Sequence, residues 1–481
     1  MRSLAMIRLL AIIIGGISLL MAAPLVVAIV LEDAVTVRAF LAPLAAGLVL
    51  ALAVIIFTPR ASLSLRRRDG LLLVFLAWIF STIAGAVPFY LAPLNMTISD
   101  AIFESSSGFA ATGATVFPDI EALPHSILLW RSMNHWAGGM GIVLLTVALM
   151  PLLGVGGFQL IKAEIPGPEK DKLTPRIADM AKVLWGAYFI LTVILVLLYR
   201  LGGMEWFDAV CHCFAIIATG GITNKNDGFA YYNSAFIDWV TTIFMLLGSL
   251  NFNLYYKVVR GKFRDFLYDT ETRAFFLIFV VAALIMSFSL LHQYGSFKES
   301  LRYGSFLAAS FLSSTGHARA DYTAWPVLAQ GVIFCLMLVG GCSGSTSGGI
   351  KVIRWTVLFK QAKNEIQRML YPQGVFSIHI NRKVGRKDVV YSIAGFLFLY
   401  FTAITVTTLA TAASGYDLFS SLTAALSFVG NIGNAFGIAG PGYNFGGFPG
   451  HLKLLYALMM LAGRLELWVL FVMFSPDFWK K

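Results

Sequence analysis

The sequence predicts an all-α protein that crosses a membrane many times. Of its 481 residues, 58% are hydrophobic and 13% are charged, and the mean hydropathy is +0.78, whereas soluble domains carry about 25% charged residues. Apolar runs at residues 71–91, 183–199 and 275–291 approach or reach the length of about 20 residues that a helix needs to cross a bilayer. Four short glycine-containing segments recur between such runs, which indicates an internally repeated membrane fold.

Ten apolar segments are expected to span the membrane. The first follows Arg2 and Arg8, is too long for the apolar core of a signal peptide and is interpreted as a retained helix. The expected spans are residues 9–31, 37–58, 70–92, 127–150, 182–201, 237–256, 274–293, 325–342, 388–411 and 452–474. With both termini in the cytoplasm, the cytoplasmic segments contain 27 of the 36 lysines and arginines, as the positive-inside rule requires. The formal charge of +11 therefore reflects membrane topology and not nucleic-acid binding.

The four glycine-containing segments, here called the first to fourth glycine turns, lie on the outer side between paired spans. They read AATGAT (110–115), ATGGIT (218–223), SSTGHA (313–318) and GNIGNA (430–435), roughly 100 residues apart, a period that fits hairpins of membrane helices. A helix-compatible stretch of about 10–15 residues precedes each turn; it is too short to cross the bilayer and fits a re-entrant pore helix. The interval from Asp100 to Gly113 is 13 residues, and so is that from Asp208 to Gly221.

Each turn alone is also compatible with an exposed connecting loop. Four turns at matched topological positions favour loops that direct backbone carbonyls into one pore, as a cation selectivity filter requires. The predicted fold is an all-α polytopic membrane protein with four helix–pore-loop–helix repeats around one pore and two extra N-terminal transmembrane helices. The expected division is residues 1–68 for these two helices, then repeats at 69–180, 181–270, 271–385 and 386–481.

Four motifs make the chain resemble the Trk/Ktr/HKT superfamily of potassium transporters, and within it the bacterial TrkH-type branch. They are DAIFESSSGFAATGAT (100–115), NHWAGGMGI (134–142), GGCSGSTSGGIKVIR (340–354) and GRLE (463–466). The resemblance extends over nearly the whole chain, including the two extra N-terminal spans. It implies potassium uptake across the bacterial inner membrane, a homodimer, and regulation by a cytosolic nucleotide-binding ring of the TrkA type.

The resemblance assigns one filter glycine to each turn. Glycine permits the backbone conformation that directs carbonyl oxygens inward, where they replace the hydration shell of K⁺. Gly220 precedes Gly221, so the register of the second turn is ambiguous, and the 13-residue spacing favours Gly221. The sequence has Ala110 and Ala111 where the family often has threonine, and His317 where an aromatic residue is usual. The expected K⁺-binding residues are Ala111, Thr112, Gly113, Gly220, Gly221, Thr315, Gly316, Asn431, Ile432 and Gly433.

Acidic residues lie in the stretches that lead to the turns. They have two readings: they concentrate cations at the outer mouth, or they cap the pore helices. The residues are Asp100, Glu104, Asp208, Glu299 and Asp417.

A glycine-rich segment, residues 340–349, here called the glycine loop, separates two apolar segments. Its glycines do not sustain a helix, and it lacks the Gly-Lys-Ser/Thr ending of a phosphate-binding loop. It is either a cytoplasmic linker or, as the resemblance implies, an intramembrane gate below the filter. Arg464 lies near the middle of the last span, where a lipid-facing arginine is unfavourable; it is either half of an inter-helix salt bridge or, as the resemblance implies, a pore residue beside the loop. The gate candidates are Gly340, Gly341, Gly344, Ser345, Thr346, Gly348, Gly349 and Arg464.

The basic segments 257–264 and 351–387 are expected to dock a cytosolic partner, to contact anionic lipid, or to do both. No enzyme motif is found, so the chain is not expected to be an enzyme or to carry a covalently bound cofactor; K⁺ is the expected cargo. The alternative function is a proton- or Na⁺-coupled K⁺ symporter. Four similar loops in one chain fit that class poorly, because its repeats are usually inverted pairs.

Overall fold

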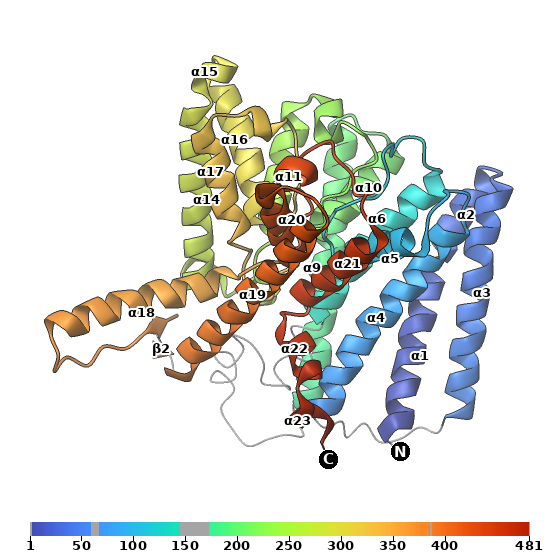
Figure 1. Cartoon of the computed structure of the whole chain (residues 1–481), viewed down its shortest axis with the longest axis horizontal. Coiled ribbons are helices and arrows are strands. Elements are labelled where there is room, and N and C mark those ends of the chain that lie inside the picture. The colour runs from blue at the N-terminus through green and yellow to red at the C-terminus, as the bar shows by residue number, and fades with distance from the viewer. Residues whose placement is uncertain (1, 59–66, 145–172, 382, 385–386, 481) are drawn as a thin grey trace.

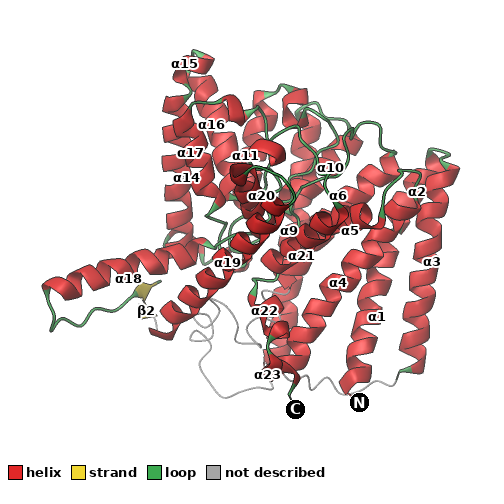
Figure 2. Ribbon diagram, in the orientation of Figure 1, coloured by secondary structure: helices red, strands yellow, loops and turns green. Residues whose placement is uncertain are grey.

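The computed structural model describes residues 2–58, 67–144, 173–381, 383–384 and 387–480, and this part of the chain is almost entirely helical (Figure 2). Strands β1 (His379–Ile380) and β2 (Lys383–Val384) form a short antiparallel pair, a small departure from the all-α prediction.

The helices in the N-terminal half are α1 (Arg2–Leu20), α2 (Ala22–Val30), α3 (Ala34–Phe57), α4 (Arg67–Leu91), α5 (Ile98–Phe109), α6 (His125–Leu144), α9 (Leu173–Leu201), α10 (Trp206–Ile217), η3 (Gly228–Tyr232) and α11 (Ala235–Gly248). Those that follow are α12 (Phe252–Val259), α13 (Phe263–Leu267), α14 (Thr270–Ser289), α15 (Leu291–Tyr294), α16 (Phe297–Leu312), η4 (Tyr322–Ala324), α17 (Val327–Met337), α18 (Val352–Leu370), α19 (Lys387–Ala413), α20 (Leu418–Gly430), η5 (Gly437–Ala439), α21 (Gly450–Arg464), α22 (Trp468–Phe474) and α23 (Pro476–Trp479).

Within the described residues, six helices are long and apolar enough to cross a membrane, or eight if each of two bent pairs counts as one span. The six correspond to the predicted spans 9–31, 37–58, 70–92, 182–201, 274–293 and 388–411. The predicted span 325–342 is shorter than expected, because α17 ends at Met337. The end of the predicted span 127–150 and the basic residues at 60–66 and 162–172 lie outside the described residues.

Two predicted spans are not continuous helices, and for them the sequence prediction is wrong. Helices α11 and α12 meet at 91°, and α21 and α22 meet at 115°. In the first break, the backbone carbonyls of Gly248 and Ser249 accept hydrogen bonds from the amides of Thr346 (3.4 Å) and Cys342 (2.9 Å). Backbone groups freed from a helix at membrane depth need such partners, so the glycine loop stabilises this break.

Four short helices, α5, α10, α16 and α20, lead into the four glycine turns. Each packs against the long helix before it (α4, α9, α14 and α19, respectively) and against the helix after it (α6, α11, α17 and α21). The following helix also packs against the next short helix: α6 on α10, α11 on α16, α17 on α20, and α21 back on α5. These contacts form a closed cycle, which brings the ends of the short helices together.

The N-terminal helices α1–α4 lie on one side of the molecule and α14–α17 on the opposite side, with the short helices α5, α10 and α20 between them (Figure 1). The two termini lie at the same end of the molecule, and α18 projects away from the helical body near that end (Figure 1). Local sequence explains several helix starts. Thr97 and Asp100 form a reciprocal capping box at α5, and Asp417 accepts a hydrogen bond from the Ser420 amide (2.9 Å) at α20.

Candidate functional site

The four glycine turns share one backbone conformation. In each turn, one glycine and the non-glycine residue two positions before it have positive φ angles, which L-residues other than glycine rarely adopt. The glycines are Gly113 (91°), Gly221 (75°), Gly316 (75°) and Gly433 (90°), and the residues two positions earlier are Ala111 (51°), Thr219 (55°), Ser314 (53°) and Asn431 (55°). In the second turn Gly221 therefore has the conformation of the other three glycines, and Gly220 is its predecessor.

The residue before each of these glycines closes the preceding short helix in the same way. Its amide donates a hydrogen bond to the carbonyl oxygen five residues earlier: Thr112 to Ser107 (2.8 Å), Gly220 to Ala215 (2.8 Å), Thr315 to Ser310 (2.8 Å) and Ile432 to Ser427 (2.9 Å). The four turns are thus equivalent in hydrogen bonding although only Thr112 and Thr315 are the same residue type.

The turns meet in a closed ring. A Cβ atom placed on any of the four glycines would collide with a backbone carbonyl oxygen of the next turn. Gly113 faces the oxygen of Gly220, Gly221 that of Thr315, Gly316 that of Ile432, and Gly433 that of Thr112. The structure therefore brings all ten residues predicted to bind K⁺ into one cluster, and it places backbone oxygens from every turn in it.

Two asparagine side chains connect the fourth turn to its neighbours. The Asn431 side-chain amide donates to the Thr112 hydroxyl (3.0 Å) and to the Met460 carbonyl (2.8 Å). The Asn434 side-chain amide donates to the carbonyl of Gly316 (2.6 Å). The sequence prediction included Asn431 and missed Asn434, although Asn434 directly follows Gly433.

A cavity of about 360 Å³, here called the outer cavity, opens beside the ring. Gly113 and Gly221 line it together with residues that follow the ring glycines in sequence, among them Thr115, His317 and Asn434. Two buried arginines, Arg131 and Arg319, also line it, and neither was predicted from the sequence.

The five predicted acids are paired or act as caps, and none of them is among the described residues that line the outer cavity. Asp100 and Asp417 cap α5 and α20, and the hydrogen bond with Ser420 lowers the pKa of Asp417 below its usual value. Glu299 is partly exposed and pairs with Arg302 (3.1 Å). These contacts favour the capping and pairing interpretation over the outer-mouth one.

The other two acids form hydrogen bonds with the segments that follow the first and second glycine turns. Buried Glu104 forms an ion pair with Arg131 (2.7 Å) and accepts a hydrogen bond from the amide of Val116 (3.1 Å). Asp208 accepts from the Asn224 side chain (3.1 Å) and from the Tyr232 hydroxyl (3.0 Å).

The glycine loop lies on the side of the ring opposite the outer cavity, against residues that precede the ring glycines. Its Thr346 hydroxyl donates to the carbonyl of Gly248 (3.0 Å) and accepts from the Thr219 hydroxyl (3.3 Å). Its Gly348 amide donates to the Ser314 hydroxyl (2.6 Å). A Cβ atom on Gly348 would meet Asn431. The loop therefore contacts the second, third and fourth turns directly.

Arg464 is the last residue of α21, at the break before α22, so it does not lie within a continuous helix as predicted. It is buried, and its guanidinium donates a hydrogen bond to the carbonyl of Thr346. Glu466 has a positive φ of 62° in the break and pairs with Arg354. Arg464 therefore ends α21, and Glu466 lies within the break that follows it.

Two further charged side chains hold the glycine loop, and the sequence prediction missed both roles. Glu271 is buried at the start of α14, and its Oε1 accepts hydrogen bonds from the amides of Ser343 (2.6 Å) and Ile353 (3.1 Å), one near the start of the loop and one beyond its end. Lys351, counted from the sequence only as a cytoplasmic basic residue, is buried and donates to the carbonyl of Ser347. Lys351, Arg464 and Glu466 line a small cavity of about 20 Å³ beside the loop.

A model of the TrkH family, described as a cation transport protein, matches residues 44–481. The potassium uptake protein TrkG of Escherichia coli K12 is 37% identical over 433 residues, which cover 88% of each chain. The potassium uptake protein TrkH of Halomonas elongata is 35% identical over 487 residues, with full coverage of both chains. The crystal structure of the potassium transporter TrkH from Vibrio parahaemolyticus superimposes with a TM-score of 0.91 at 32% identity over the whole of both chains, which confirms the predicted helical membrane fold.

Proposed function

The chain belongs to the TrkH family of cation transport proteins, and from this premise we propose that it takes up K⁺ across the bacterial inner membrane. The relatives are named potassium uptake proteins of the Trk system. The family consists of transporters and not enzymes, which agrees with the prediction from sequence.

The ring of four glycine turns is the single observation that supports this proposal most directly. In our proposal its backbone oxygens form the selectivity filter and replace the water around a dehydrated K⁺ ion. The contributing residues are Ala111, Thr112, Gly113, Gly220, Gly221, Thr315, Gly316, Asn431, Ile432 and Gly433. The cyclic packing of the short helices supports a division into four repeats at 69–180, 181–270, 271–385 and 386–481 around this filter.

The glycine loop and Arg464 form the gate in this proposal. The loop lies against the ring on the side away from the outer cavity, and Arg464 is hydrogen-bonded to it. A buried arginine there opposes the passage of cations. The residues of the gate are Gly340, Gly341, Gly344, Ser345, Thr346, Gly348, Gly349 and Arg464.

In our proposal, a regulatory partner binds at the cytoplasmic surface around α18. Helix α18 extends from the body of the protein, and several large apolar side chains on it, including Phe359 and Met369, are exposed. Such a surface suits a second subunit or a cytosolic ring of the TrkA type, and the basic residues around it suit anionic lipid. We therefore propose that the protein forms a homodimer. The bias of lysine and arginine toward one side of the membrane further supports a cytoplasmic position for both termini.

Electrical recording of the purified protein in a bilayer tests this function. Under opposed K⁺ and Na⁺ gradients, a selective channel gives discrete currents that reverse near the K⁺ potential. Slow flux that requires a proton or Na⁺ gradient would instead support the symporter alternative. Buried Lys351 and partly buried Glu466 are the charged side chains beside the gate that this alternative would involve. Absence of K⁺ flux in folded protein under every gradient would overturn the proposal.

A further inference from the structure

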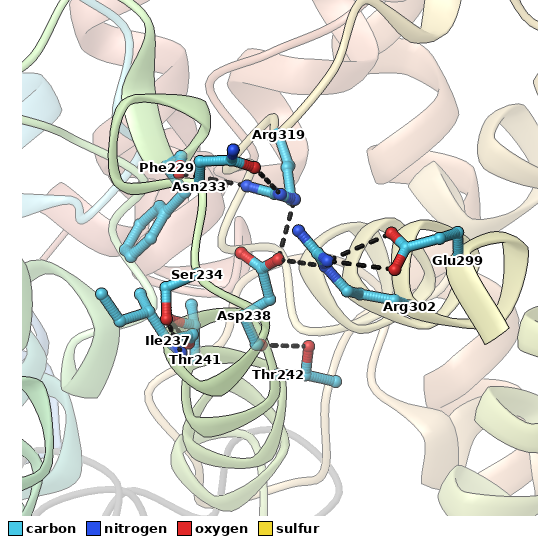
Figure 3. Close-up of polar contacts among 10 residues, drawn as sticks. All are labelled: Phe229, Asn233, Ser234, Ile237, Asp238, Thr241, Thr242, Glu299, Arg302 and Arg319. Atoms are coloured by element: carbon cyan, nitrogen blue, oxygen red, sulfur yellow. Dashed lines mark hydrogen bonds and ion pairs between the residues drawn. The ribbon is translucent and has the colours of Figure 1, made fainter. Parts of the chain in front are cut away.

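Asp238 is a buried carboxylate in the N-terminal part of α11, and it holds two arginines (Figure 3). Its Oδ2 lies 2.6 Å from Nε of Arg302 and 2.8 Å from Nε of Arg319. The side chain of Asp238 is 1% exposed, and that of Arg319 is 2% exposed. A buried acid between two arginines needs both to offset its loss of hydration.

In the sequence, one of the two arginines comes before the third glycine turn and the other comes after it. Arg302 is on α16, the short helix that leads into the turn, and it also bonds Glu299 (3.1 Å). Arg319 follows Gly316 by three residues and also donates to the Phe229 carbonyl (3.3 Å). One carboxylate oxygen of α11, a helix of the proposed second repeat, thus contacts both α16, which precedes the third turn, and the segment that follows this turn.

The first and second turns are fastened differently. There, the carboxylate that holds the exit segment is on the short helix of the same repeat: Glu104 on α5 binds the amide of Val116, and Asp208 on α10 binds Asn224. In the third repeat the short helix instead carries Arg302, and the acid comes from its neighbour. The position of the third turn therefore depends on the packing of α11 against α16.

The cluster also places a charged side chain at the outer cavity. Arg319 lines this cavity together with Gly113, Gly221 and His317. An uncompensated guanidinium there would repel cations that approach the ring. Asp238 compensates it from within the protein.

We propose that Asp238 is a positioning residue that sets K⁺ over Na⁺ selectivity, because it clamps the third glycine turn from the neighbouring repeat through Arg302 and Arg319. This inference rests on the proposed function. A filter distinguishes the two ions only while its oxygens hold their positions against collapse onto the smaller ion. The Gly316 carbonyl, which accepts from Asn434 (2.6 Å), lies between the two clamped segments.

The test compares Asp238→Asn with the wild-type protein in liposomes, by reversal potentials with K⁺ on one side and Na⁺ on the other. Asp238→Asn keeps the size of the side chain and removes its charge. We expect the K⁺/Na⁺ permeability ratio to fall by about tenfold, a change equivalent to about 1.4 kcal/mol, and K⁺ uptake to require a higher external concentration. Asp238→Glu, which retains the charge, should recover most of the ratio.

Glu299→Gln is the matched control, because Glu299 bonds Arg302 at the partly exposed edge of the cluster and touches neither Arg319 nor the outer cavity. It should leave the ratio unchanged. Arg319→Lys keeps the positive charge and loses the planar fork that reaches the Phe229 carbonyl, so it should lower the ratio without weakening K⁺ uptake as Asp238→Asn does. If Asp238→Asn does not fold, the permeability ratio of Arg319→Lys tests the clamp instead.

A wild-type ratio in Asp238→Asn, or in Arg319→Lys when only that variant folds, would overturn the clamp. An equal fall in Glu299→Gln would also overturn it, since the effect would then follow any change in the cluster. A wild-type protein that does not conduct K⁺ would overturn the proposed function instead, so the two failures are distinguishable.

Discussion

The guanidinium of Arg464 donates a hydrogen bond to the backbone carbonyl of Thr346, which joins the end of α21 to the glycine loop beneath the ring of turns. The same threonine contacts Thr219 of the second turn through its side chain (3.3 Å). A single residue of the loop is therefore in contact with both the ring and the buried arginine.

Replacing Arg464 with alanine should increase K⁺ flux in the absence of any activating partner. A hydrogen bond to a charged group contributes about 1.5–3 kcal/mol, so its loss should raise the open fraction by about tenfold or more. Rubidium uptake into liposomes with the purified protein measures this flux. Arg464→Lys, which retains a buried cation, should remain closer to the wild type. Unchanged or lower flux in folded Arg464→Ala would contradict a gating role.

Replacing Gly316 with alanine should abolish selective K⁺ uptake. The added Cβ would collide with the carbonyl oxygen of Ile432, and the residue would have to keep a φ of 75°, which costs an L-residue about 1–2 kcal/mol. Growth of a potassium-uptake-deficient strain on low K⁺ measures the effect, with membrane protein yield as a check on folding. Gly331→Ala in α17 is the control, because a Cβ there meets no atom within 4 Å; equal growth of both variants would refute the tight-ring interpretation.

Replacing Glu271 with alanine should loosen the glycine loop. The amides of Ser343 and Ile353 would lose their shared acceptor, and each unsatisfied buried donor costs about 1–3 kcal/mol. We expect a lower melting temperature in detergent and more flux without activator. Glu271→Gln keeps an oxygen in the same place, so it should lie between the alanine variant and the wild type. A melting temperature and a flux equal to those of the wild type in Glu271→Ala would show that the loop does not depend on this carboxylate.

Replacing Glu104 with glutamine should destabilise the protein, because it leaves Arg131 buried without its counter-charge. Breaking a buried pair from one side costs about 3–5 kcal/mol, and both side chains here are at most 3% exposed. The double variant Glu104→Gln/Arg131→Met should recover part of the loss. Thermal unfolding of these two variants and of Arg131→Met, followed by size-exclusion chromatography, measures this coupling. Additive losses in the double variant would argue against an energetic link between the two residues.

The positions of the four glycine turns were predictable because their signals are local. Each turn has a glycine in a similar sequence context: Gly113, Gly221, Gly316 and Gly433. A positive φ favours glycine at that one position, so it leaves a mark in the local sequence. The glycine loop was recognisable for the same reason, since a helix does not persist through so many glycines.

The breaks in two predicted spans were not predictable in this way. The segment between α11 and α12 contains no proline, and its freed carbonyls at Gly248 and Ser249 are satisfied by residues of the glycine loop about 100 positions later in the chain. At the second break, Glu466 finds its partner in Arg354. Hydropathy reports the transfer of a segment into the bilayer and not where its backbone finds distant partners.

Hydropathy, charge bias and glycine content are properties of short segments, so the amino-acid sequence alone was enough to identify a helical membrane protein, the positions of its four glycine turns and the family that it resembles. The contacts between the turns, those of Lys351 and Glu271 with the glycine loop, and the ion pairs of Asp238 with Arg302 and Arg319 became visible only in the folded structure. Those relationships depend on side chains that are distant in sequence, and a buried charge acquires its role only when folding supplies its partner.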